Sequence, residues 1–419
     1  MTEVDSKKLK IAMVVDSYDS HGGGLVSTKR FTEALRKRGN KVTVISTGKC
    51  DKDKVVLKSF YVPFAKRIMK DMDVAFAVPD EQKIKDVLKN VDVVHIQLPF
   101  YLGIKTITYA RELGKPVVVS FHVQAENITK NIGVSSKRVI NLIYRFFVKN
   151  FYNRSDLVIC PSKFAQTELK SFGLKAKNKI LSNGHIPEYY PQRVKRKFSN
   201  KFVILCVGRL SAEKNQKMII EAISKSKYSK EIQLLIKGHG PMKKELKEFS
   251  KILPNKPVFF EQLPLKKMVE LFNSADMLVH AGMVELEGMV VLEAISCGVP
   301  PLIYDYPKSA SSQFALTNKS LFKSVEDLTK KIDFWYEHPH ELQLAKEQYL
   351  ELSKKYTIEE STKKLEKYYL EAIEQNKKKP KKETEKKNGR SWFRFLKVFA
   401  KLKNIKNIRI PRPFKRKKK

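Results

Sequence analysis

Two glutamates, Glu285 and Glu293, stand eight positions apart across a glycine and an apolar run. If Gly288 marks the turn before a helix, Glu285 lies at the helix mouth and Glu293 about one and a half turns inside it. The free N–H groups and partial positive charge of a helix N-terminus form a natural seat for phosphate. Carboxylates beside that seat can accept hydrogen bonds from sugar hydroxyls. The segment therefore predicts a sugar-nucleotide site.

Two cations, Arg209 and Lys214, follow the apolar run 202–207 in the same half of the chain. In open α/β sheets ligands bind beyond the carboxyl ends of the strands, where these side chains could neutralise a diphosphate. The alternative interpretation is two solvated surface cations, and the nearby glutamate pair favours the diphosphate. Gly238 follows the next apolar run, 233–236, and predicts a turn beside the nucleotide.

The N-terminal half offers weaker signals. Residues 22–24 are three glycines that follow the apolar run 9–17, so the backbone could approach a ligand closely there, or simply turn tightly. His122 follows the run 116–121, and its place at a predicted strand end favours a ligand contact over a purely structural histidine. Asp71-Met-Asp73 matches an Asp-x-Asp metal pattern but lies in a basic amphipathic segment, so we expect no metal there.

The elements that must position these residues alternate between short apolar runs and stretches long enough for a helix. Such alternation is typical of doubly wound parallel sheets. The pattern restarts after a polar, basic segment at 191–200, which indicates a second domain of the same type. We expect helices at 27–38, 215–226 and 358–375. We expect strands at 9–17, 39–46, 91–96, 116–121, 157–160, 202–207, 233–236 and 277–280, with 300–304 as the last.

We expect two Rossmann-like domains, at 1–195 and 196–357, each with an α/β fold. A helix at 358–376 returns towards the first domain, and a basic tail occupies 377–419. The chain has 419 residues and 42% hydrophobic residues, enough for sizeable cores. Its four cysteines lack metal spacing, and three of them lie in or beside apolar runs, which indicates buried thiols in a reducing compartment. No apolar run is long enough for a signal peptide or a membrane span, so we expect a cytoplasmic or peripheral protein.

Charge points to an anionic partner. The net charge is +39, and residues 377–419 hold 20 lysines and arginines against two glutamates. Basic amphipathic stretches at 61–72 and 137–152 are typical of helices that lie in the headgroup plane of anionic bilayers. An ordinary packed helix is the alternative for 137–152. The membrane-facing candidates are Lys137, Arg138, Arg145, Lys149, Trp392, Phe393, Arg394, Phe395 and Lys397.

The mixture of aromatic and basic residues in the tail suits two anionic partners. Each cation near an anionic membrane contributes roughly 1 kcal/mol of attraction. The same composition would suit base stacking and phosphate contacts with RNA. The tail by itself does not separate these two interpretations.

Taken together, these motifs resemble the retaining glycosyltransferases of family 4, which have the two-domain GT-B fold. The resemblance covers about residues 8–375. It is carried by Glu285 and Glu293 with seven residues between them, and by the segments 22–24, 207–214 and 292–300, with lesser matches at 161–162 and 182–184. Leu286 and Glu287 depart from the family pattern, which usually has Pro-Phe there.

The resemblance implies a role for each motif. Glu285 would contact the donor sugar, Glu293 the ribose, Arg209 and Lys214 the diphosphate, and His122 the transferred sugar. The residues implied in catalysis are Glu285, His122, Arg209 and Lys214. The donor-binding residues are Gly23, Gly24, Arg209, Lys214, Gly238, Glu285, Gly288, Met289, Val290 and Glu293. The motifs contain no clear enzymic nucleophile, and front-face attack by the acceptor hydroxyl is the usual proposal for this family.

Residues 279–288 and 307–316 resemble a narrower group, the bacterial glycolipid synthases that glucosylate diacylglycerol. This resemblance implies transfer of glucose from UDP-glucose to 1,2-diacylglycerol, by an enzyme peripheral on the inner face of the cell membrane. It implies no required cofactor, with magnesium optional, and no specific nucleic acid partner. One alternative is a family 4 enzyme acting on a polysaccharide, a teichoic acid or another soluble acceptor. A non-catalytic polyanion-binding protein is the other.

Overall fold

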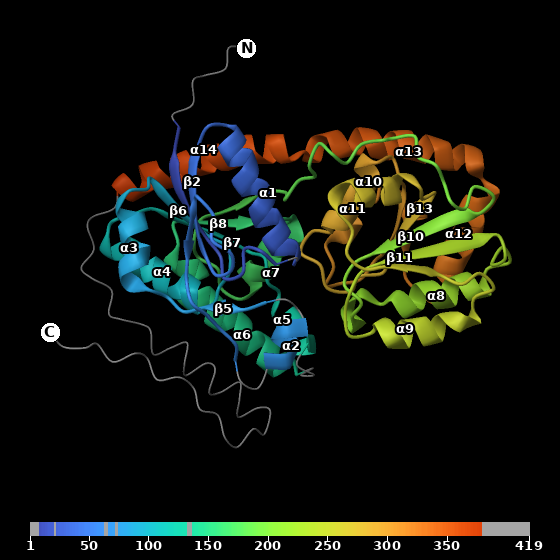
Figure 1. Cartoon of the computed structure of the whole chain (residues 1–419), viewed down its shortest axis with the longest axis horizontal. Coiled ribbons are helices and arrows are strands. Elements are labelled where there is room, and N and C mark those ends of the chain that lie inside the picture. Colours follow the sequence, from blue (N-terminus) through green and yellow to red (C-terminus); the bar gives the residue numbers. More distant parts are fainter. Residues whose placement is uncertain (1–7, 21, 63–65, 72–73, 132–135, 379–419) are drawn as a thin grey trace, which may run out of the picture.

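The computed structural model describes residues 8–20, 22–62, 66–71, 74–131 and 136–378. Two parallel sheets form two α/β domains side by side, with the first domain on the left in Figure 1 and the second on the right. The prediction of two Rossmann-like sheets is confirmed.

The first domain is built on a seven-stranded sheet with the order β3-β2-β1-β6-β7-β8-β9. All its pairings are parallel. The central strands β1, β6, β7 and β8 are almost wholly buried, as short β-branched and apolar runs require, whereas the edge strands β3 and β9 are partly exposed. Its strands are β1 (Lys10–Val14), β2 (Lys41–Ser46), β3 (Lys54–Val56), β6 (Val93–Ile96), β7 (Val117–Ser120), β8 (Leu157–Cys160) and β9 (Asn178–Ile180). A small antiparallel pair joins β4 (Ser59–Phe60) to β5 (Phe76–Ala77).

Helices cover both faces of this sheet. The helices are α1 (Gly23–Lys37), α2 (Lys66–Asp71), α3 (Glu81–Lys89), α4 (Tyr101–Glu112), α5 (Ala125–Asn131), α6 (Lys137–Asn150) and α7 (Lys163–Ser171). One core lies between the sheet and α3, α4, α6 and α7, and the other lies under α1. Both faces are therefore closed to water, as an all-parallel sheet requires.

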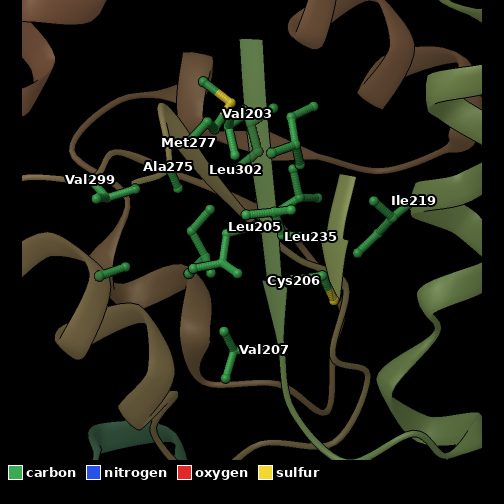
Figure 2. Close-up of a cluster of buried hydrophobic side chains, with 14 of the residues drawn as sticks. Val203, Leu205, Cys206, Val207, Ile219, Leu235, Ala275, Met277, Val299 and Leu302 are labelled. Atoms are coloured by element: carbon green, nitrogen blue, oxygen red, sulfur yellow. The ribbon is translucent and has the colours of Figure 1, made fainter. Parts of the chain in front are cut away.

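The second domain has a six-stranded sheet with the order β12-β11-β10-β13-β14-β15. Its strands are β10 (Phe202–Val207), β11 (Ile232–Lys237), β12 (Val258–Phe260), β13 (Met277–His280), β14 (Pro301–Tyr304) and β15 (Leu321–Phe322). Figure 2 shows part of its core, where Val203, Leu205 and Met277 pack together. The prediction that 300–304 is the last strand is wrong, because β15 pairs with β14. Strand β15 has only two residues, which is too few to show the sequence pattern that predicts a strand.

The helices of this half are α8 (Gln216–Lys225), α9 (Lys243–Phe249), α10 (Leu265–Asn273), α11 (Met289–Ser296), α12 (Val325–Glu337), α13 (Pro339–Ser353) and α14 (Ile358–Lys377). Helices α8 and α9 lie on one side of the sheet, and α10 and α11 on the other (Figure 1). Helix α14 then runs back over the first domain, where Leu365 and Tyr369 join the core under α1. The Tyr369 hydroxyl lies 2.7 Å from Nδ1 of the buried His95 on β6.

Helix α1 begins at Gly23, four residues earlier than the sequence predicts. Gly22 is the N-cap, and its carbonyl accepts hydrogen bonds from the N–H groups of Leu25 and Val26, both at 2.9 Å. Glycine is a poor helix former, so the sequence favours a loop here. Gly23 and Gly24 instead form the first turn of the helix.

Candidate functional site

The site lies where the strand order of each sheet reverses. In the second domain this point is between β10 and β13, and in the first it is between β1 and β6. Ligands bind at such switch points, beyond the carboxyl ends of the strands, because the loops diverge there. Gly208 and Arg209 follow β10, Gly282 and Glu285 follow β13, and His122 follows β7.

Glu285 is held between two basic side chains. Its Oε1 forms an ion pair with the ammonium of Lys214 and lies 3.2 Å from Nε2 of His280. Burial alone would raise the pKa of Glu285, but Lys214 and His280 outweigh it and lower the pKa to about 2. The carboxylate is therefore fully charged at neutral pH. A charged acceptor of this kind suits hydrogen bonds from sugar hydroxyls.

Gly282 makes this arrangement possible. A Cβ atom at position 282 would lie 2.8 Å from Nε2 of His280 and 2.9 Å from Oε1 of Glu285. Real Cβ atoms do not approach other atoms so closely, so any larger residue would displace one of the two side chains.

Helix α11 starts beside this carboxylate. Its N-cap is Gly288, with a φ of 103° that favours glycine. The first N–H groups of a helix lack partners within it, so those of Met289 and Val290 are available to an anion. Both residues are partly exposed, whereas Glu293 one turn on is buried. The predicted turn at Gly288 and the helix behind it are present.

Arg209 and Lys214 lie in the loop between β10 and α8. Gln216 at the start of α8 donates a hydrogen bond of 2.7 Å to the Arg209 carbonyl, which fixes the backbone of this loop. The Arg209 side chain is half-buried. Gly238 packs against the same loop, where a Cβ would lie 1.9 Å from the Gly208 carbonyl oxygen. Because it has no side chain, Gly238 allows the backbones that follow β10 and β11 to approach each other closely.

His122 faces the start of α1 in the first domain. A Cβ at Gly24 would lie 2.7 Å from the Cβ of His122, whereas a Cβ at Gly23 would meet nothing within 4 Å. Burial lowers the pKa of His122 to about 4, so the ring is neutral at pH 7. Its Nε2 lies 3.0 Å from Oε1 of Gln97. An amide oxygen only accepts, so Nε2 carries the proton and Nδ1 remains an acceptor.

The loop before α11 also contacts the first domain. Ser162, the N-cap of α7, donates a hydrogen bond of 2.6 Å to the carbonyl of Leu286. Asn183, just after β9, donates from its backbone N–H and from Nδ2 to the Glu287 carboxylate, at 3.0 and 2.5 Å. The departure from the family pattern at Leu286 and Glu287 therefore lies at the boundary between the two domains.

Glu287 is buried, with 3% of its surface exposed. Burial raises the pKa of Glu287 to about 7, although hydrogen bonds from residues 182 and 183 act in the opposite direction. Its carboxyl group therefore titrates near neutrality, in contrast to Glu285 two residues earlier.

Sequence reasoning missed four residues of this region: Arg30, Asn183, His280 and Gly282. His280 is the last residue of a predicted strand, and this position at the carboxyl end of the sheet could have marked it as a site residue. Asn183 could also have been found, because it lies in the segment 182–184 that carried part of the family resemblance. Arg30 lies in the middle of a helix, and nothing in its spacing distinguishes this buried arginine from one on the surface.

Helix α6 carries the described part of the predicted membrane-facing set. Lys137, Arg138, Arg145 and Lys149 are exposed, and Leu142 between them is 44% exposed. The opposite face packs into the core of the first domain, so the helix has one basic outer surface. None of the helices in the described part of the chain is both long enough and apolar enough to span a membrane.

Several predicted residues lie outside the described residues. They are Asp73 and the aromatic and basic residues Trp392, Phe393, Arg394, Phe395 and Lys397.

Two domains of this fold, with a charged cluster at their facing strand ends, define the GT-B class of glycosyltransferases. Family comparison places the chain within that class. Residues 21–189 match the family described as Glycosyltransferase Family 4, and residues 191–354 match Glycosyl transferases group 1. The chain belongs to these family 4 glycosyltransferases.

Similar proteins include enzymes of glycolipid synthesis. The alpha-monoglucosyldiacylglycerol synthase of Streptococcus pneumoniae is 25% identical over 71% of this chain and 72% of its own length. The catalytic domain of the cholesterol-alpha-glucosyltransferase of Helicobacter pylori is 39% identical over 37% of this chain and 99% of that domain, with a TM-score of 0.34. HepE of Anabaena, solved with UDP and glucose, is 16% identical over 87% of this chain and all of its own, with a TM-score of 0.68.

Proposed function

We propose that this chain transfers glucose, with retention, from UDP-glucose to a hydroxyl of a membrane lipid, for which 1,2-diacylglycerol is the expected acceptor. The observation that carries the proposal is the fixed Glu285 carboxylate beside Lys214 and the start of α11. A charged acceptor for sugar hydroxyls and a seat for phosphate lie side by side there.

The donor would lie across the strand ends of the second domain. Arg209 and Lys214 would face the diphosphate, together with the N–H groups of Met289 and Val290. Glu285 would accept hydrogen bonds from the sugar, and Glu293 from the ribose. In this arrangement Lys214 contacts both Glu285 and the diphosphate, so it would couple the position of the sugar to that of the leaving group.

In the transfer step, the bond between the anomeric carbon and the diphosphate oxygen breaks, and a bond to the acceptor oxygen forms on the same face. The proton of the acceptor hydroxyl passes to the leaving diphosphate. Arg209, Lys214 and the start of α11 stabilise the charge that develops on that diphosphate. Neutral His122, with Nδ1 as an acceptor, would face the transferred sugar from the first domain.

A lipid acceptor is supported by the basic outer surface of α6 and by the similarity to a monoglucosyldiacylglycerol synthase. Lysines and arginines around a leucine suit the headgroup region of an anionic bilayer. We place the protein at the cytoplasmic face of a membrane, as a peripheral enzyme, with α6 and the segment 377–419 against the lipid.

The test is a transfer assay with radiolabelled UDP-glucose and vesicles of phosphatidylglycerol that contain diacylglycerol. Parallel reactions use UDP-galactose and GDP-mannose as donors, and cholesterol or a soluble polysaccharide as acceptors. We expect an α-glucosyl lipid, with the anomeric configuration read by NMR, and much slower transfer by Glu285→Gln. Transfer only to the polysaccharide would show that the lipid acceptor is wrong, and a β-linked product would show that retention is wrong.

A further inference from the structure

An arginine of the first domain forms an ion pair with Glu293 of the second domain. Nη2 of Arg30, on α1, lies 2.5 Å from Oε1 of Glu293, on α11. The two side chains are only 8% and 10% exposed, so this is a buried ion pair between domains. Burial works against the charge of Arg30, but Glu293 and the ring of Tyr189 favour it, and the pKa of Arg30 stays above its usual value.

The same face of α1 also forms a hydrogen bond with Asn183, which contacts the loop before α11. Ser27, one turn before Arg30, donates a hydrogen bond of 2.5 Å to Oδ1 of Asn183. Asn183 in turn donates to Glu287, and Arg30 Nη1 donates to the carbonyl of Gly184 at 3.4 Å. One helical turn of α1 is therefore connected to both ends of the segment 287–293, to Glu293 directly and to Glu287 through Asn183.

We propose that Arg30 is a positioning residue for the nucleotide. It holds the Glu293 carboxylate in the orientation that accepts the ribose hydroxyls, and so makes nucleotide binding depend on the packing of the two domains. This inference rests on the proposed function, since it takes Glu293 as the ribose contact.

The geometry explains how the Glu293 carboxylate can bind both Arg30 and the ribose. Arg30 engages Oε1, which leaves Oε2 as the atom that can accept a ribose hydroxyl. A glutamate side chain has several rotamers, and a guanidinium at a fixed place selects one of them before the ligand arrives. A buried carboxylate also needs a nearby positive charge, which α11 itself does not supply.

Arg30 is not needed merely to join the domains. Ser162 with Leu286, and Asn183 with Glu287, already make contacts across the same boundary. What Arg30 adds is a positive charge directed at Glu293, the proposed ribose contact. Its loss should therefore weaken nucleotide binding more than it weakens the fold.

The test measures the Kd for UDP by calorimetry, and kcat and KM for UDP-glucose, in the full chain. We expect Arg30→Met to raise both the Kd for UDP and the donor KM at least tenfold, with kcat changed less than threefold. Arg30→Lys should recover part of the affinity. Arg38→Met is the matched control, because Arg38 ends the same helix and pairs with Glu366 at 2.8 Å, far from the strand ends. Its Kd for UDP should stay within twofold of the wild-type value.

A double-mutant cycle separates positioning from general damage. If Arg30 acts through Glu293, Arg30→Met should add less than a twofold change in the Kd for UDP to a chain that already carries Glu293→Gln. Full additivity of the two changes, or unchanged or tighter UDP binding by Arg30→Met, would overturn the proposal. A wild-type chain that binds UDP but transfers no sugar would instead refute the proposed function, while the UDP measurements would still decide the role of Arg30.

Discussion

Nε2 of His280 lies 3.2 Å from Oε1 of Glu285, and the ammonium of Lys214 contacts the same oxygen. The three groups come from the end of β13, the loop after it and the loop after β10. A carboxylate that is buried would ordinarily become neutral, but two basic neighbours keep Glu285 charged. The cluster is thus ready to accept hydrogen bonds before any ligand binds.

Replacing Glu285 by glutamine should lower kcat/KM for the sugar donor by about 10- to 150-fold. The reason is that hydrogen bonds to charged groups contribute about 1.5–3 kcal/mol. Initial rates with varied donor concentration give this value. Glu221→Gln is the control, because Glu221 pairs with Lys225 on the exposed surface of α8. If both variants transfer sugar as fast as the wild type, Glu285 does not contact the donor.

Alanine at Gly24 should lower kcat about tenfold or more relative to alanine at Gly23. Only at Gly24 would the new Cβ meet His122, at 2.7 Å, and overpacking of this kind typically costs about 1–3 kcal/mol. The two variants share a helix turn and a residue type, so they differ mainly in this contact. Equal rates for both would show that the position of His122 is not critical for transfer.

Glu287 should make the stability of the protein depend on pH. Its pKa is raised to about 7 in the folded chain, so the folded state binds a proton that the unfolded state releases near pH 4.5. Its contribution is therefore fully present below about pH 4.5 and is lost as the pH rises through 7. Over this window the change amounts to about 3 kcal/mol at most.

Glu287→Gln tests this directly, because glutamine has no proton to lose in that range. Denaturant unfolding of both chains between pH 4.5 and 8 should show a smaller decrease of stability with rising pH in the variant. Asp16 also has a raised pKa of about 7, but it is present in both chains, so the difference between them reports Glu287. Parallel curves would mean that Glu287 does not titrate in this window.

The basic surface of α6 should control binding to anionic vesicles. Replacing Lys137, Arg145 and Lys149 by glutamine removes three cations, each worth about 1 kcal/mol near an anionic surface, so affinity should fall about 100-fold. Sedimentation with phosphatidylglycerol vesicles measures this, and neutral phosphatidylcholine vesicles should bind neither chain well.

The control for α6 is a variant with the same change in net charge on the second domain. Lys244, Lys247 and Lys266 are exposed there, and their replacement by glutamine should reduce vesicle affinity far less. An equal loss in both variants would mean that total charge, and not the α6 surface, drives membrane binding.

The sequence by itself determined the two α/β domains, because buried parallel strands are short apolar runs that remain visible without an alignment. It also predicted that Arg209 and Lys214 follow a strand and that Glu285 precedes a helix in the same domain, and the structure brings Lys214 and Glu285 together as an ion pair. The sequence also predicted the turn at Gly288, because a turn with a positive φ favours glycine. These features depend on local sequence order.

Only the tertiary structure decided which side chains meet. The ion pair between Arg30 and Glu293 joins residues 263 positions apart, and the bond between Asn183 and Glu287 joins residues 104 apart. Such contacts depend on how two separately folded domains pack, and helical spacing carries no information about that packing. Burial makes the loss of either partner costly, because a charge removed from water needs a partner.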